Sequence, residues 1–383
     1  MAWLVILTTA LITVWSGTLL AGTIKIGAIL AETGPVSFLG VPAVRSLRMR
    51  VEQLNAQGGI QGKKIELIVK DSQGSPEKAI SFARQLIEEE QVFAIIGPST
   101  SGETLKIKKI CQAGKTILIS CSAAELITHP VAPYVFKTAP SDSFAVRRIY
   151  ETMNTMGISQ IAVLTGNTGF GKAGKKQLEK YAAEYGITIV AKEVYDKKAT
   201  DLSAVVAKLK ADAQIQAVVN WSVVPAQSIV ATNIRQVGWE IPLFQSHGFA
   251  NIRYVQAAGA AAEGVLFPAS RILVAEELEE GPVKAALLQY ENEYKQRFNE
   301  NVSTFGGHSY DAMNILVKAI ETAGTDKEKV RQAIESITGL IGTAGIFTFS
   351  AQDHGGLDLD AFVMLTVKDG AFRLLSPQTL PAN

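Results

Sequence analysis

The chain has 383 residues, with 37 basic and 36 acidic side chains and a formal net charge of +1. Because acids and bases are interspersed, the composition excludes a basic stripe for nucleic acid and an acidic disordered tail. Hydrophobic residues make up 47% of the chain and charged residues 19%, which is enough apolar material for two buried cores.

An apolar leader opens the chain and runs from Leu4 to Leu20. Ala21 follows directly and is a small residue of the kind that signal peptidase cuts after. We therefore expect residues 1–22 to be a cleaved signal peptide and the mature protein to be periplasmic. No Lys or Arg precedes the apolar core, which departs from the usual signal-peptide pattern. The alternative is a permanent transmembrane anchor, which needs about 20 apolar residues with flanking charges.

Strand-like runs then alternate with amphipathic helices along most of the chain. The first array has strands at 24–30, 65–69, 92–97 and 116–120, and helices at 41–54, 76–87 and 103–113. After a segment rich in Pro and Ser at 139–143, the pattern resumes with strands at 160–165, 187–194, 217–221 and 242–245 and with helices between them. Two such arrays predict an α/β protein with two doubly wound parallel sheets.

The last hundred residues follow a different pattern. Helices are expected at 282–298, 310–322 and 326–336. Two strand-like runs at 345–350 and 362–367 are then predicted to form a hairpin-like pair.

Cysteines and histidines are few and scattered. Cys111 and Cys121 fall at opposite ends of one predicted helix-strand unit, too far apart for an easy bridge, so two buried free thiols are favoured. The four histidines, at 129, 247, 308 and 354, show no metal-ligand spacing. We expect neither a metal nor a cofactor.

A glycine-rich segment from Gly166 to Ala173 resembles a phosphate-binding loop. Ala173 stands where such a loop needs Ser or Thr for magnesium. The preferred interpretation is a glycine turn that brings Phe170 to the edge of a cleft.

Hydroxyl side chains follow two neighbouring strands. Ser99, Thr100 and Ser101 come after one strand, and Ser120 and Ser122 after the next. Two helix N-termini at one sheet edge form a cradle that suits a carboxylate. Ordinary capping is one alternative, and a serine nucleophile of an exported hydrolase, served by His129 or His247, is another.

Several segments together resemble the periplasmic binding proteins of the leucine/isoleucine/valine type. The segments begin at Ile26, Thr33, Asn55, Asp71, Ile96, Ile119, Phe170, Ala262 and Ser309. The resemblance implies a type I periplasmic binding fold, in which a three-segment hinge joins two flavodoxin-like lobes. It assigns 23–139 plus 272–344 to one lobe and 140–271 plus 345–383 to the other, with crossings near 139–141, 268–272 and 344–347.

The resemblance also implies a function and a set of ligand contacts. Such a protein is not an enzyme: as a monomer, it clamps one small molecule between its lobes and delivers it to an inner-membrane ABC permease. Matched position by position, Ser101, Ser122 and Ala123, with Thr100 beside them, would hold a ligand carboxylate. The walls would come from Leu39 with Phe38 beside it, from Phe170, from Trp221 or Ser222, and from Phe305.

Two departures from the family pattern bear on the ligand. Ala124 and His247 stand where the amino-acid binders place a threonine and an acidic residue for the ligand ammonium. An ammonium buried without partners is costly, so a carboxylate without an amino group is predicted, such as an aromatic or branched acid or a 2-oxo acid. A branched-chain amino-acid binder and a sensory ligand-binding subunit are the alternatives.

Overall fold

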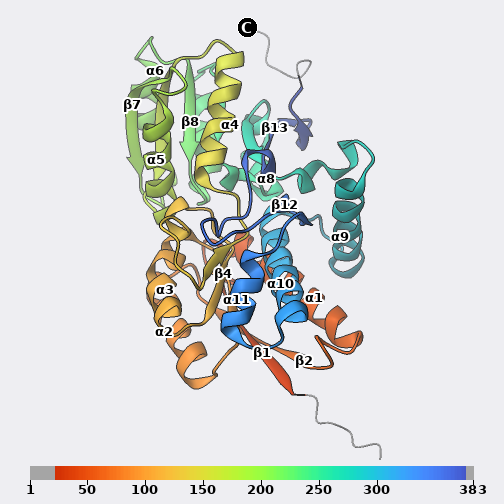
Figure 1. Cartoon of the computed structure of the whole chain (residues 1–383). Coiled ribbons are helices and arrows are strands. Elements are labelled where there is room, and N and C mark those ends of the chain that lie inside the picture. The colour runs from red at the N-terminus through yellow and green to blue at the C-terminus, as the bar shows by residue number, and fades with distance from the viewer. Residues whose placement is uncertain (1–21, 377–383) are drawn as a thin grey trace, which may run out of the picture.

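The computed structural model describes residues 22–376, which form two α/β lobes stacked along the long axis of Figure 1. The predicted signal peptide falls almost wholly outside the described residues. Within residues 22–376, no helix is both long and apolar enough to span a bilayer.

The first lobe is built on a five-stranded parallel sheet with strand order β2-β1-β3-β4-β5. The strands are β1 (Thr23–Leu30), β2 (Lys64–Asp71), β3 (Ala94–Ile96), β4 (Ile117–Ser120) and β5 (Val135–Lys137). Side chains alternate between the two faces of the sheet. Ile95 and Leu118 pack against α2 (Pro76–Arg84) and α3 (Ser101–Ala113), while Ile96 and Ile119 join the opposite apolar layer.

That opposite layer is closed by helices from distant parts of the chain. It contains apolar residues of α1 (Ser37–Ala56), α10 (Thr304–Ala323) and α11 (Lys327–Glu335), and α1 and α10 lie side by side in Figure 1. Beside them, α9 (Pro282–Phe298) packs Tyr290 and Leu287 against Met49 of α1. Helices α9, α10 and α11, which come late in the chain, therefore complete the first lobe.

The second lobe has a seven-stranded sheet with strand order β14-β13-β10-β9-β8-β6-β7. Its strands are β6 (Gln160–Gly166), β7 (Thr188–Tyr195), β8 (Ala217–Trp221), β9 (Leu243–Gln245), β10 (Leu266–Ala269), β13 (Val363–Lys368) and β14 (Ala371–Leu374). Its α-helices are α4 (Asp142–Thr155), α5 (Gly169–Tyr181), α6 (Ser203–Lys210), α7 (Ala226–Gln236) and α8 (Ile252–Ala258). The strands from β7 to β10 are parallel, whereas β13 and β14 are antiparallel additions.

The predicted pairing of 345–350 with 362–367 is wrong. β12 (Ile346–Phe347) pairs with β11 (Leu340–Ile341), whereas β13 pairs with β14 and β10. Alternating apolar residues identify a strand but do not specify its partner. The sequence analysis also missed β5 and β10.

The chain passes between the lobes three times. Two passages, between β5 and α4 and just after β10, lie where the resemblance placed them. The third comes later than predicted: Phe347, Phe349 and Leu357 pack in the first lobe, and Phe362 is the first residue of this segment in the core of the second. The expected boundary at 344–345 therefore moves to 361–362.

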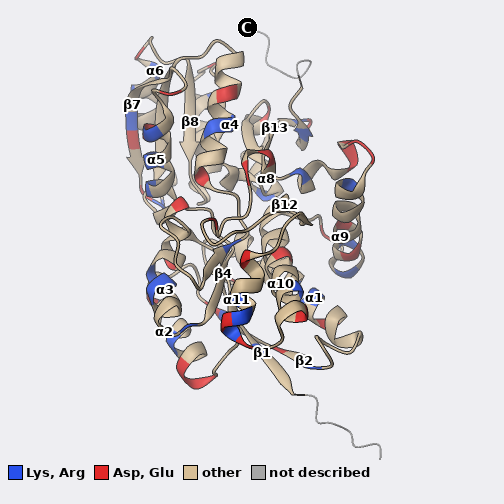
Figure 2. Cartoon of the chain, in the orientation of Figure 1, with Lys and Arg blue, Asp and Glu red and all other residues tan. Residues whose placement is uncertain are grey.

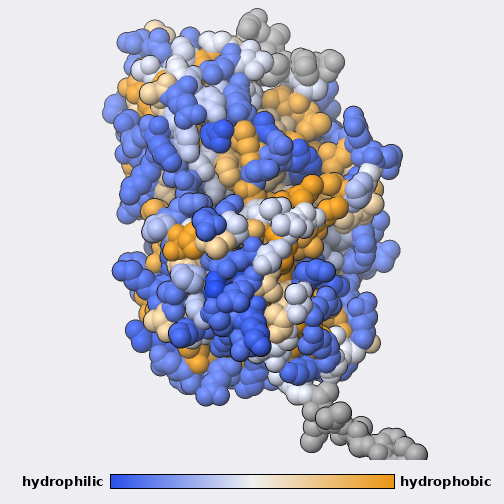
Figure 3. Space-filling model, in the orientation of Figure 1, coloured by the Kyte–Doolittle hydropathy of each residue, from blue (hydrophilic) through white to orange (hydrophobic). Residues whose placement is uncertain are grey.

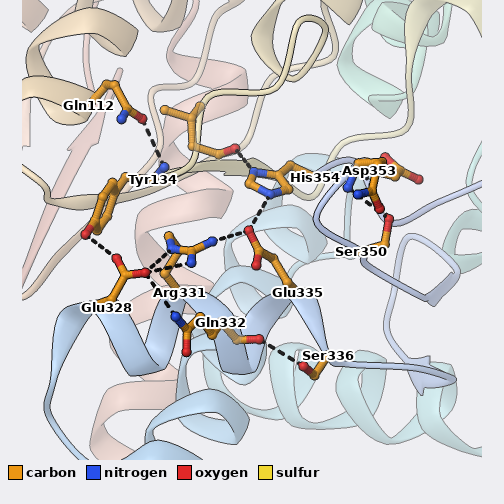
Figure 4. Close-up of polar contacts among 12 residues, drawn as sticks. Gln112, Tyr134, Glu328, Arg331, Gln332, Glu335, Ser336, Ser350, Asp353 and His354 are labelled. Atoms are coloured by element: carbon orange, nitrogen blue, oxygen red, sulfur yellow. Dashed lines mark hydrogen bonds and ion pairs between the residues drawn. The ribbon is translucent and has the colours of Figure 1, made fainter.

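A polar network anchors α11 to the segment that leads into β5 (Figure 4). Tyr134 Oη donates to Glu328 Oε2 at 2.6 Å, and Arg331 Nη2 donates to Glu328 Oε1 at 2.7 Å. Arg331 also pairs with Glu335, whose Oε1 lies 3.0 Å from Nε2 of the buried His354. These contacts hold β5 in place next to the first crossing.

Both cysteines are buried free thiols, as predicted. Cys111 belongs to one apolar layer of the first sheet and Cys121 to the layer on the opposite face. Burial raises the pKa of each thiol to about 12, so neither is a reactive thiolate in this conformation.

Charged residues of both signs are spread over the elements of both lobes (Figure 2), in agreement with the balanced composition. In Figure 3, apolar surface gathers around β12 near the junction of the lobes. Ile346 of β12 is 52% exposed there.

Candidate functional site

A small cavity lies between the lobes at the carboxyl ends of β3, β4, β8 and β9. It is lined by Leu39, Ser99, Thr100, Ser101, Cys121, Ser122, Ala123, Ala139, Phe170, Val223, His247, Gly248, Phe305 and His308. Its volume of about 30 Å³ is room for one or two water molecules. The lobes are therefore closed onto one another.

On the first-lobe side, α3 begins at the cavity. Thr100 caps this helix, donating to Glu103 Oε2 at 2.6 Å and accepting from the Glu103 N–H at 3.4 Å. Ser101 Oγ accepts a hydrogen bond from the Ala124 N–H at 3.2 Å, which ties the turn after β3 to the turn after β4. Within residues 22–376, the Ser101 hydroxyl donates to no acceptor.

Three amide groups at these two turns donate to no acceptor within residues 22–376. They are the N–H groups of Ser101, Gly102 and Ala123. Unused amides at a helix N-terminus, together with one from a neighbouring turn, attract an anion. This geometry supports the predicted cradle.

Ser122 differs from its predicted role. It lines the cavity, but its hydroxyl donates to the Pro98 carbonyl at 2.9 Å and its N–H donates to Ser120 Oγ at 3.2 Å. Both donors are used inside the first lobe, so in this conformation Ser122 has none left for a ligand.

On the second-lobe side, aromatic rings surround His247. The ring centroids of Phe170 and Trp221 lie 5.1 and 5.5 Å from that of His247. Trp221 is fully buried and does not line the cavity: it packs behind Phe170 and His247, over Gly174, where a Cβ would come within 2.0 Å of Trp221 Nε1. The prediction that Trp221 forms a wall is wrong in this conformation.

Phe38 also lies outside the inner cavity. Its ring packs edge-on against Tyr254 and Phe305, with centroids 4.8 and 6.1 Å away, and it lines a separate pocket on the outside. Leu39 and Phe305 do line the cavity, and their contact with a ligand stays a prediction.

The glycine-rich segment is a helix start. Thr168 Oγ1 accepts from the Gly171 N–H at 3.0 Å, and a Cβ on Gly171 would lie 1.9 Å from the Gly166 carbonyl oxygen. The tight turn places Phe170 on the cavity, as the preferred interpretation predicted.

Sequence reasoning missed a buried carboxylate beside the site. Asp142, the first residue of α4, is fully buried, and neither of its carboxylate oxygens has a hydrogen-bond partner within the described residues. Its Oδ1 lies 3.6 Å from His247 Nε2, and its N–H donates to the Ala123 carbonyl at 3.2 Å. An acidic side chain therefore lies next to His247, although the resemblance assigned no acidic residue to the site.

A buried lysine accompanies this carboxylate. Lys137, at the end of β5, donates to the Ala123 carbonyl at 3.1 Å and to Ser141 Oγ at 2.6 Å. In sequence, Asp142 resembles an ordinary helix-start residue and Lys137 an exposed one. The only feature of the sequence that could have identified Asp142 as a site residue is its place at the start of the helix that follows a hinge crossing.

Burial dominates the electrostatics of this cluster. It lowers the pKa of His247 and of His308 to about 3, so both rings are neutral at pH 7 when the cleft is empty. Burial also raises the pKa of Asp142 and lowers that of Lys137, and the attraction between these two charges opposes both shifts.

An outer chamber of about 470 Å³ adjoins the inner cavity and shares Thr100, Phe170 and Val223 with it. Apolar side chains form much of its wall, including Pro35, Val36, Pro76 and Val224. Lys172, Lys197 and Lys198 of the second lobe also line it. The outer chamber therefore offers much more volume than the inner cavity that it adjoins.

The lobes touch directly on both sides of the cavity. Gly102 of α3 faces Gly169 of α5 so closely that a Cβ on Gly169 would lie 2.6 Å from the Gly102 Cα. Elsewhere, Asn251 Nδ2 of the second lobe donates to the Phe38 carbonyl of the first at 3.2 Å.

A family model described as "Periplasmic binding protein" matches residues 23–371. The chain belongs to this family. It is 27% identical over 324 residues to the leucine-, isoleucine-, valine-, threonine- and alanine-binding protein of Pseudomonas aeruginosa, covering 83% of each chain. To Leu/Ile/Val-binding protein homolog 3 of Brucella melitensis it is 24% identical, covering 91% of this chain and 92% of the relative.

Solved structures agree with this assignment. The LivJ substrate-binding protein of Streptococcus pneumoniae, in complex with isoleucine, has a TM-score of 0.81 at 25% identity and covers 93% of this chain and 100% of its own. The Rhodopseudomonas palustris protein Rp1789 has a TM-score of 0.86 at 25% identity, with the same coverage. The predicted fold class is confirmed.

Membership of this family indicates the general function of the chain. Periplasmic binding proteins of this kind bind small molecules outside the cytoplasm and work with ABC-transporter permeases, and the relatives are binding proteins rather than enzymes. The hydrolase alternative loses its support, because the family model and the relatives describe binding proteins rather than enzymes.

Proposed function

We propose that this periplasmic binding protein is the extracytoplasmic component of an ABC uptake system and that its ligand is a small carboxylate without an amino group. One observation carries the proposal: Ser101 and Ala123, whose amides are unused within residues 22–376, line the same inner cavity as His247. The unused amides attract an anion, and His247 can donate one more hydrogen bond to that anion.

The shape of the two spaces supports an elongated acid. The inner cavity has the size of a carboxylate head group, whereas a benzene ring needs about 150 Å³. The outer chamber provides that room beyond Phe170 and Val223. An aromatic or branched acid, or a 2-oxo acid, would place its carboxylate inside and its apolar body in the chamber, with a small displacement of Phe170.

The wall of the inner cavity argues against an ammonium. His247 lines it but Asp142 does not, so the imidazole ring stands between the cavity and the carboxylate. Ala124 offers no hydroxyl. A buried ammonium would lack an anionic partner unless His247 moved aside, and a charge left unpaired in a closed cleft costs several kcal/mol.

A branched-chain amino acid is the second candidate, and Asp142 is the observation that favours it. Both oxygens of this buried carboxylate lack partners within residues 22–376, and a ligand ammonium could pair with them if His247 rotated. The Pseudomonas relative is named for leucine, isoleucine, valine, threonine and alanine.

Calorimetric titration of the mature protein distinguishes the two candidates. We expect binding of at least one acid among phenylpyruvate, benzoylformate and 4-hydroxybenzoate, and weaker or no binding of leucine. Tight binding of leucine with no binding of the acids would overturn the proposal that the ligand is an acid without an amino group. It would establish a branched-chain amino acid as the ligand.

A further inference from the structure

We infer that a carboxylate ligand enters the cleft together with one proton, which the His247–Asp142 pair takes up. This inference rests on the proposed function. It makes Asp142 a positioning residue that acts on the ligand through His247, a role that neither the sequence nor the relatives assign.

The geometry sets the two side chains toward each other. His247 Nε2 lies 3.6 Å from Asp142 Oδ1, slightly beyond hydrogen-bond length. Both nitrogens of His247 and both oxygens of Asp142 lack a partner within the described residues. Four unpartnered polar atoms on two buried, facing side chains are unusual in a folded protein, so the pair is incomplete until something binds.

The surroundings contain few other charges. Lys137 of β5 is the neighbouring cation, and His308 of α10 is the other titratable ring that influences His247. Glu125 influences Asp142 from the first lobe and pairs with Lys180 at 3.8 Å. The groups packed on the His247 ring are the uncharged rings of Phe170, Trp221 and Phe362.

A charge count shows why a proton is needed. When Asp142 is ionised in the empty cleft, its charge and that of Lys137 sum to zero and both histidines are neutral. A carboxylate ligand changes the sum to −1 beside buried side chains, where an uncompensated charge is strongly unfavourable. One proton from solvent restores neutrality, and no covalent bond changes. Because burial raises the pKa of Asp142, any fraction of it that is already protonated reduces the uptake below one proton.

His247 is suited to receive that proton. Protonated, its Nε2–H would donate to Asp142 Oδ1 while its Nδ1–H would donate to the ligand, so one imidazolium bridges two carboxylates. Burial holds the pKa of His247 at about 3 in the empty cleft, and two flanking anions raise it on binding.

Proton uptake can be measured directly. Titration with benzoylformate, or with 4-hydroxybenzoate if it binds more tightly, in buffers of different ionisation enthalpy gives the number of protons taken up. Near pH 7 we expect up to one proton per ligand. Above the pKa of the complex, affinity should fall by up to tenfold per pH unit as pH rises.

Two variants test the assignment to this pair. In Asp142→Asn the charge of Lys137 is free to balance the ligand, so binding should continue without proton uptake. In His247→Gln a hydrogen-bond donor remains but cannot titrate, so proton uptake should also disappear. This second variant keeps the inference testable if Asp142→Asn does not fold. In His129→Gln, the matched control with an exposed histidine, uptake should equal that of the wild type.

The outcomes separate the inference from the proposed function. Binding of an acid without proton uptake, or uptake that persists in His247→Gln, overturns the inference and leaves the function standing. Failure of all three acids to bind overturns both. Leucine, which carries its own positive charge, should show no proton uptake if it binds.

Discussion

At the scale of single residues, His247 carries the ligand prediction. It lines the inner cavity, both of its nitrogens lack partners within the described residues, and rings enclose it on several sides. A neutral imidazole in such a place can donate or accept one hydrogen bond. Which ligand it admits therefore depends on whether it stays over Asp142 or moves away.

Replacing His247 by alanine should weaken binding of an acid by about 1–3 kcal/mol, the range for a lost hydrogen bond to a charged group. Calorimetry on wild type and variant measures the change, and thermal unfolding checks that the fold is intact. If leucine is the true ligand, the same variant should bind it equally or better, because Asp142 becomes accessible. Unchanged affinity for an acid would remove His247 from the site.

At the scale of elements, two helix N-termini meet across the cleft. α3 of the first lobe and α5 of the second approach at Gly102 and Gly169, where side chains would keep them apart. The two positions are not equivalent. A Cβ on Gly102 would lie 3.7 Å from the Gly169 Cα, an ordinary contact, whereas a Cβ on Gly169 would lie 2.6 Å from the Gly102 Cα.

Gly169→Ala should therefore hinder closure, and Gly102→Ala is its matched control. Because the clash is with backbone atoms, we expect Gly169→Ala to lower the affinity by about tenfold or more through a smaller closed population. Its thermal stability should not fall, because alanine favours a helix over glycine. Equal affinity of the two variants would show that the ligand-bound lobes stand further apart than in this structure.

At the scale of the whole molecule, closure brings together lobes that are joined by three chain passages. Apart from the cavity lining, Asn251 makes a polar contact between them by donating to the Phe38 carbonyl. Its Oδ1 also accepts from the Arg253 N–H at 3.0 Å and so caps α8. The two functions of this side chain can be separated by substitution.

Asn251→Asp keeps the cap and removes the donor that crosses the cleft. We expect the lost hydrogen bond, worth about 0.5–1.5 kcal/mol, to shift the molecule toward the open form and to weaken apparent affinity by about 2- to 12-fold. Small-angle X-ray scattering without ligand should give a larger radius of gyration than the wild type. An unchanged radius and affinity would mean that this contact does not hold the lobes together.

Much of the fold followed from local patterns. Apolar periodicity predicted most of the parallel strands and their helices, because a buried strand or an amphipathic helix is encoded by neighbouring residues. Short β5 and β10 escaped notice, and the partner of β12 was wrong, since strand pairing depends on residues far apart in the chain. The third crossing shifted for the same reason.

For the site, the sequence by itself determined which residue types stand at the strand ends: Ser101, Ala123, Phe170 and His247 all line the cavity. Only the tertiary structure decided that the Ser122 hydroxyl donates to a carbonyl of the first lobe and that Trp221 is buried behind the residues that line the cavity. It also decided that Asp142 is buried against His247. The physical reason is that burial and hydrogen bonding are set by elements packed from elsewhere in the chain, whereas residue type and periodicity are local properties.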